Sequence, residues 1–148
     1  MPELLPKPKH LGPEYASQFA DPAIVAAYHH RPPYAPAVFP PWFDEVQTLI
    51  ERYSTNRAYQ SYNLIAELEQ RGLFEQHGVH LSEAVSFEQS VESYIESIHS
   101  RNGFSRDRIT HQAATDFDAE VRGLLVERCP DGTVQFNLVA RIVFGRPR

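Results

Sequence analysis

The sequence contains a single cysteine, Cys129, among 148 residues. One thiol excludes an internal disulfide and a metal cluster held by thiolates. No stretch reaches the roughly 18 consecutive apolar residues that a membrane-spanning helix needs. The start, Met1-Pro2-Glu3, also lacks the basic and then apolar pattern of a signal peptide. These absences predict a cytoplasmic protein with no membrane partner.

Basic residues and paired glycines are also scarce. The 14 Lys and Arg are outnumbered by 19 Asp and Glu, which gives a net charge of -5. This balance argues against a nucleic-acid partner, because phosphate binding requires a basic face. The seven glycines are isolated and no G-x-G occurs. This excludes the glycine-rich turn with which a doubly wound sheet holds its cofactor.

What is present predicts one α+β domain. Hydrophobic content of 42% and charged content of 22% are ordinary for a globular protein. Residues 1–14 carry four prolines and indicate a flexible tail, and residues 15–148 are predicted to form the domain. Four to five helices should pack on an antiparallel strand pair. The expected helices lie near 41–53, 61–71, 87–100 and 106–127, and the strands near 78–86 and 133–144. Ser61 is expected to cap the second of these helices and Gly72 to end it.

The helix near 87–100 has the clearest signals. Ser86 and Gln89 stand in the S-x-x-Q relation of a capping box, which predicts a helix start. Asn102-Gly103 predicts its end, because glycine adopts the left-handed conformation after a helix without strain. His99, Ser100 and Arg101 would then project from the last turn into a cleft. Ser105 is expected to cap the following helix.

The strand near 133–144 predicts association. Large apolar residues occupy every second position, and Val139 and Val143 lie on the other side, so we expect a central strand. Two strands alone form a marginal sheet, and an open edge invites pairing with another chain. We therefore predict a homodimer that uses this strand or the helix that begins at Trp42.

The segment before residue 40 has a different character. Asp21-Pro22 predicts a helix start, since aspartate caps well and proline is tolerated in the first turn. Residues 29–36, HHRPPYAP, then form a rigid strap, because consecutive prolines forbid helix and favour extended backbone.

Several stretches carry a resemblance to a known family. They are ADPAIVAAYHHRPPY, PPWFDEVQTLIERYS, VESYIESIHSRNGFSRDR, FDAEVRGLL and VARIVFGRP. The chain resembles class I S-adenosylmethionine-dependent methyltransferases of the small-molecule kind. Residues 15–39 resemble the N-terminal segment that covers the cofactor, and we call them the gate segment. Residues 40–148 resemble the C-terminal region.

The resemblance implies S-adenosylmethionine as the cofactor and a set of binding residues. In the gate segment it implies contacts with a carboxylate or an aromatic ligand, and His99 and Arg101 would line the old acceptor cleft. The implied gate residues are Tyr28, His29, Arg31 and Tyr34. The alternative is that these side chains pack or are solvated, and that a basic last turn simply complements the helix dipole.

The departures from the family decide the functional prediction. The gate segment runs directly into Pro40-Pro41-Trp42, where the family has its glycine-rich cofactor core. We therefore predict no tight S-adenosylmethionine binding and no independent methyltransferase activity. No metal is expected either, because His77-x-x-His80 lacks a third ligand. Three hypotheses stay open: a reduced methyltransferase-family protein, a small-molecule-binding protein or repurposed enzyme, and a homodimeric assembly module.

Overall fold

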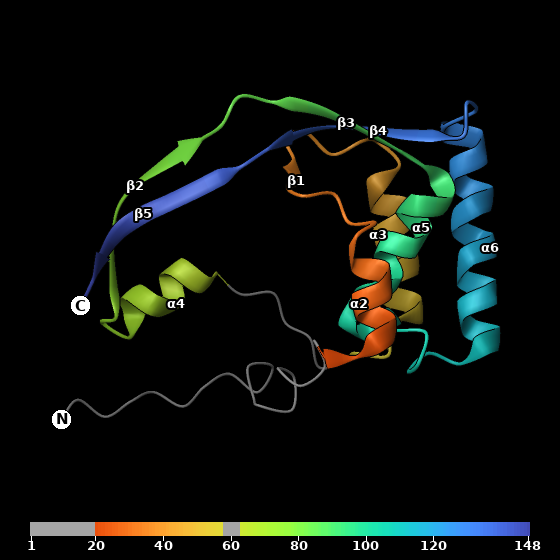
Figure 1. Ribbon diagram of the computed structural model, residues 1–148, viewed down its shortest axis with the longest axis horizontal. Coiled ribbons are helices and arrows are strands. Elements are labelled where there is room, and N and C mark those ends of the chain that lie inside the picture. Colours follow the sequence, from red (N-terminus) through yellow and green to blue (C-terminus); the bar gives the residue numbers. More distant parts are fainter. Residues whose placement is uncertain (1–19, 58–62) are drawn as a thin grey trace.

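The computed structural model describes residues 20–57 and 63–148 and divides them into a body and an arm. Figure 1 shows four helices, α2, α3, α5 and α6, all on one side of the sheet that contains β3 and β4. Two further strands, β2 and β5, extend away from these helices, with α4 near their far end. The α+β class predicted from the sequence is confirmed. The proline-rich tail at 1–14 lies outside the described residues.

Both sheets are antiparallel. The first has the order β1-β4-β3, with β1 at Ala35–Pro36, β3 at Val85–Ser90 and β4 at Thr133–Val139. The second pairs β2, Phe74–Leu81, with β5, Arg141–Pro147. The predicted antiparallel pairing is therefore confirmed, and so is the central position of β4. Each of the two predicted strands is, however, two strands, because the pairing is interrupted at residues 82–84 and at Ala140.

The face of the first sheet that meets the helices is apolar. Val134, Phe136 and Leu138 are at most 5% exposed, whereas Gln135 and Asn137 between them are exposed. This alternation is typical of an antiparallel sheet with one solvated side. The same alternation continues into β5, but Ile142 and Phe144 are 51% and 52% exposed. No described helix of the body lies beneath that part of the strand (Figure 1).

The helices of the body are α2 (Pro22–Tyr28), α3 (Phe43–Tyr53), α5 (Val91–His99) and α6 (His111–Arg128), with a short 3-10 turn at Asn102–Phe104. Their apolar faces, together with the first sheet, form one core. Its members with no exposed surface are Val46, Ile98, Phe117, Val121, Leu125 and Val134. Within the described chain, no helix has both the length and the apolar character needed to cross a membrane.

Two local predictions are confirmed. The carboxylate of Asp21 accepts hydrogen bonds from the amides of Ala23 and Ile24, and Pro22 occupies the first helical position of α2. Gly72 has a φ of 67° after the C-terminus of α4, Leu64–Gln70. A residue with a side chain is strained in that conformation, so glycine ends this helix. Ser61, expected to cap it, lies outside the described residues, and Asn63 accepts the capping hydrogen bonds.

Three predictions at the ends of α5 and α6 were wrong. Ser86 and Gln89 do not form a capping box, because both lie in β3 and pair with β4. Helix α5 starts four residues later, where the Ser90 hydroxyl accepts from the amide of Ser93. Gly103 is not left-handed. It is needed for close packing instead, since a side chain there would collide with the hydroxyl of Ser54.

Helix α6 begins at Thr110 rather than at Ser105. The Thr110 hydroxyl accepts from the amide of Ala113. Ser105 is fully buried and donates to the carboxylate of Asp21, 2.7 Å away. This hydrogen bond fixes the start of α2 to the loop before α6.

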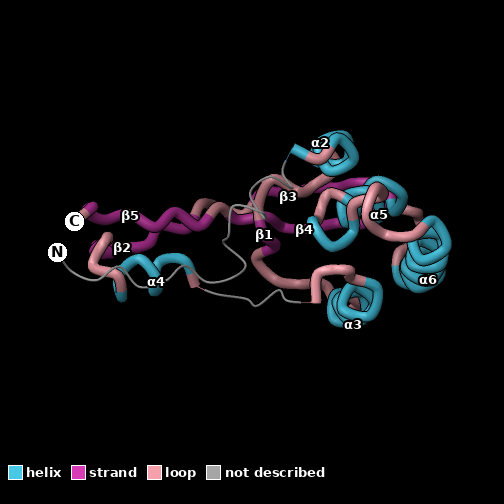
Figure 2. Tube along the Cα trace, turned by 90° about the horizontal axis from the view of Figure 1, so that it is seen from below, coloured by secondary structure: helices cyan, strands magenta, loops and turns pink. Residues whose placement is uncertain are grey.

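The arm consists of α4, β2 and β5, and none of its residues is buried. The view in Figure 2 shows it as a narrow extension of the body. The ring of Phe144 packs over Gly78 of the neighbouring strand. A Cβ atom added at Gly78 would lie only 2.6 Å from this ring. The arm thus has strand pairing and local contacts but no core of its own.

Candidate ligand-binding site

A cavity of about 390 Å³ lies between the strap and helix α5. Its walls come from the strap, from the start of α3, from one face of α5 and from β4. The lining residues are Arg31, Pro32, Pro33, Tyr34, Ala35, Pro36, Phe39, Phe43, Tyr94, Ser97, Arg101 and Phe136. Proline, alanine and phenylalanine supply most of these residues, and polar groups make up about half of the lining surface.

The strap is held in position at both of its ends. At one end, Asp21 fixes α2 through the hydrogen bond from Ser105 and an ion pair with Arg108 at 3.3 Å. The hydrogen bond from Ser105 holds the pKa of Asp21 below its ordinary value. At the other end, Ala35 and Pro36 pair with the edge of β4, a position that a proline tolerates because its missing N–H faces away from the ladder. The cavity wall is therefore part of the fold.

Three of the predicted site residues meet at this cavity. Arg31 and Tyr34 reach it from the strap and Arg101 from the end of α5. Tyr28 does not line the cavity, but the Arg31 guanidinium lies 5.1 Å from the centre of its ring. A cation over an aromatic face is attracted to it, so Tyr28 helps to position Arg31.

The other two predicted residues lie elsewhere. His29 is exposed and its ring stands 3.9 Å from that of His30. His99 does not project into a cleft, because it is only 1% exposed and packs against Phe104 and Phe117.

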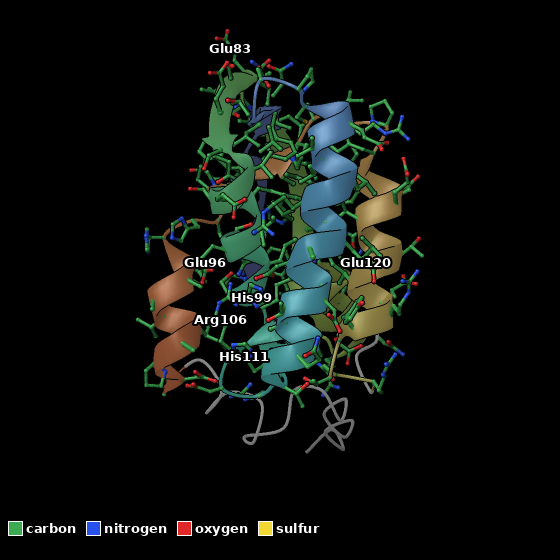
Figure 3. The ribbon with its side chains drawn as sticks, turned by 90° about the vertical axis from the view of Figure 1, so that its right-hand side faces the viewer. Glu83, Glu96, His99, Arg106, His111 and Glu120 are labelled. Atoms are coloured by element: carbon green, nitrogen blue, oxygen red, sulfur yellow. The ribbon has the colours of Figure 1, made fainter. Side chains whose placement is uncertain are left out.

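His99 belongs to a separate polar network. Its Nδ1 lies 2.8 Å from the carbonyl oxygen of Phe104 and its Nε2 lies 2.7 Å from a carboxylate oxygen of Asp118. Arg106 bridges Asp118 and Glu96 at 3.2 and 2.7 Å. Figure 3 shows Glu96, His99 and Arg106 gathered beside α6. With both ring nitrogens engaged and no exposed edge, His99 holds the structure together and has no access to a ligand.

Tyr94 is the cavity residue that sequence reasoning missed. It is 4% exposed, and its ring packs 5.5 Å from Trp42 and 5.8 Å from Phe136. Its hydroxyl is buried without a hydrogen-bond partner among the described residues. Burial raises the pKa of Tyr94 to about 12, while the nearby charge of Arg101 acts in the opposite direction. The sequence signal was its place in the apolar stripe of α5, which predicts packing alone.

Metal binding finds no support in the described residues. No three His, Cys, Asp or Glu side chains there are grouped so that they could hold a metal ion. Cys129 is half-buried at the end of α6, and burial raises the pKa of its thiol.

Comparison of the chain with protein-family models, with curated proteins and with solved structures gave no match. The resemblance to methyltransferases therefore stays a prediction that is based on the sequence motifs alone.

Proposed function

We propose that this protein binds a small molecule in the cavity between the strap and α5. The observation that carries the proposal is the convergence of Arg31, Tyr34, Tyr94 and Arg101 on one cavity. Its volume of about 390 Å³ falls in the range of small-molecule sites. Such sites combine apolar walls with placed polar groups, and here phenylalanine and proline side chains stand beside two arginines.

Binding rather than catalysis is the activity that these residues support best. The buried imidazole of His99 is engaged on both sides, and the two arginines of the cavity are not general bases at neutral pH. We also propose that the protein descends from the methyltransferase family and that its binding role arose from the role of that family's gate segment. This descent is favoured by the place of the gate segment, which forms one wall of the cavity, as the resemblance implies.

Filling the cavity should weaken binding. Ala35 lines the cavity and is exposed, so Ala35→Phe should fold normally and occupy the space. Ala37→Phe, two residues further along the chain and outside the described lining, is the matched control. We expect small aromatic fragments to bind the unmutated protein and Ala37→Phe, and to bind Ala35→Phe at least about tenfold more weakly, which is a loss of about 1.4 kcal/mol.

Ligand-observed NMR with a fragment panel measures this difference. No fragment bound at millimolar concentration, or equal binding by all three proteins, would contradict the proposal. S-adenosylmethionine belongs in the panel. We expect no tight binding, since no glycine-rich turn is present to hold its methionine end. Micromolar affinity would show that the gate segment holds the cofactor by another arrangement.

Self-association is a second candidate function, and the arm favours it. Ile142 and Phe144 are each more than half exposed on one face of the β2–β5 pair, whose outer edges have no neighbour among the described strands. Open edges with exposed apolar side chains pair readily with another chain, and a two-fold dimer lets one patch serve both partners. We propose that a second copy covers this surface of the arm.

The dimer can be tested with one charge. Ile142→Lys should weaken it at least about tenfold, because a lysine would have to be buried without a partner. Val126→Lys, an equally exposed site on α6, should leave it unchanged. Sedimentation velocity over a concentration series measures the association. A monodisperse monomer of the unmutated chain at high micromolar concentration would rule out the dimer.

A further inference from the structure

We infer that the cavity selects an organic anion, a carboxylate or phosphate on an apolar and preferably aromatic body. This inference rests on the proposed function, since it names the ligand class of the same cavity. Three features of the lining carry it: the sign of its charges, the apolar remainder and the buried hydroxyl of Tyr94.

The charges of the lining all have one sign. Of the twelve lining residues in the described part of the chain, Arg31 and Arg101 are charged and none is acidic, although the whole sequence has a net charge of -5. Guanidinium groups pair with carboxylates and phosphates through parallel hydrogen bonds and bind them more strongly than a point charge does. The cavity is therefore a basic site in an acidic protein.

The missing acidic groups also restrict the ligand. An ammonium or sulfonium group that enters the cavity would lose water and find no carboxylate among the described lining residues to pair with, which is costly. Cations and amino-acid zwitterions should therefore bind poorly. The remaining walls consist of proline rings and aromatic side chains, including Phe39, Phe43 and Phe136, which suit a flat apolar body.

Tyr94 also lines the cavity, and its buried hydroxyl has no hydrogen-bond partner among the described residues. A buried hydroxyl without a partner destabilises the unliganded protein, because its lost hydration is not replaced. A ligand oxygen that accepts from this hydroxyl would restore the missing hydrogen bond. Since the hydroxyl is shielded from water, the ligand must enter beneath the strap and displace it slightly to reach this donor.

The test uses three probes that share one ring system: 2-naphthoate, 2-naphthyl phosphate and the neutral 2-naphthamide. We expect at least one anion to bind the full chain about tenfold or more tightly than the amide, and to bind less tightly as salt is raised. The order of the two anions distinguishes a carboxylate ligand from a phosphate ligand. Isothermal titration or ligand-observed NMR gives the affinities.

Two variants assign the contacts. Arg31→Ala removes an exposed guanidinium and should weaken the favoured anion about tenfold or more, while its effect on the amide stays within about twofold. Arg141→Ala, an exposed arginine of the arm, is the matched control and should change neither affinity. Tyr94→Phe should weaken the anion severalfold and, at the same time, leave the melting temperature of the unliganded protein unchanged or higher.

The outcomes separate the two proposals. Equal binding of the amide and both anions would overturn the anion inference and leave the proposed function standing. Binding of no probe would also overturn it, and the fragment panel with Ala35→Phe would then decide the proposed function by itself. An Arg31→Ala protein that keeps full affinity for the anion would overturn the assignment of this charge to the ligand.

Discussion

Replacing His99 by leucine should lower the free energy of unfolding by about 3 kcal/mol, near the lower end of the cost of removing one partner from a buried ion pair. His99 is 1% exposed and bonds both Asp118 and the carbonyl of Phe104. Leucine fills a similar space but leaves both acceptors without their donor. Arg106 still contacts Asp118, which keeps the loss from being larger.

The matched control is His111→Leu. His111 is exposed in the first turn of α6 (Figure 3), so its replacement should change the stability by less than about 0.5 kcal/mol. Urea unfolding followed by circular dichroism measures both variants. A His99→Leu protein as stable as the unmutated chain would refute the structural role of the network.

The acid limb of the stability curve identifies the mechanism. Burial raises the pKa of Asp118, but the hydrogen bond and charge of His99 and the charge of Arg106 outweigh it, so the pKa lies below its ordinary value. A carboxyl group with a lowered folded pKa stabilises the protein above its unfolded pKa and loses this contribution as the pH falls through the folded pKa. In His99→Leu the free energy of unfolding should fall less as the solution is acidified than it does in the unmutated protein. A simple packing defect would leave this acid-dependent fall unchanged.

Replacing Phe117 by alanine should cost about 3–5 kcal/mol, the range for removing a large side chain from a core. Phe117 has no exposed surface, and its ring lies 4.7 Å from that of Phe104 and 5.6 Å from that of Tyr53. These two neighbours come from different elements, so the cavity cannot close without moving α3 against the 3-10 turn.

Val126→Ala provides the control on the same helix. Val126 is 60% exposed, and its truncation should cost less than about 0.5 kcal/mol. Phe117→Leu should fall between the two variants, because it leaves a smaller cavity. A Phe117→Ala protein that loses less than about 1 kcal/mol in urea unfolding would mean that the core refills the space.

Sequence reasoning succeeded where the deciding signal was local. Asp21-Pro22 starts a helix and Gly72 ends one, because capping and backbone conformation involve only a few neighbouring residues. The alternation at 134–138 predicts a strand for the same reason. Ser86 and Gln89 misled because the S-x-x-Q spacing is not specific to a helix start. Both residues lie in a strand instead, and only pairing with β4 decides between the two structures.

The candidate site was only partly predictable. Arg31, Tyr34 and Arg101 were identified as binding residues, but the distance between them depends on β1 pairing with β4, about a hundred residues later in the chain. Tyr94 could not be identified, because its helical spacing places it in the apolar stripe of α5. A missing hydrogen-bond partner is a property of the folded surroundings and has no signature in the sequence.

The lack of buried side chains in the arm has a consequence for the cooperativity of unfolding. An amide proton exchanges with solvent through the unfolding event of lowest free energy that exposes it. This free energy rises with the amount of apolar surface that the event exposes. In β4 an opening exposes Val134 and Phe136, so exchange there requires most of the body to unfold. Beyond Ala140, the pairing of β5 with β2 can open while the body stays folded. One nearly continuous pair of strands thus spans two cooperative units, and the arm can open while the cavity beside α5 stays intact.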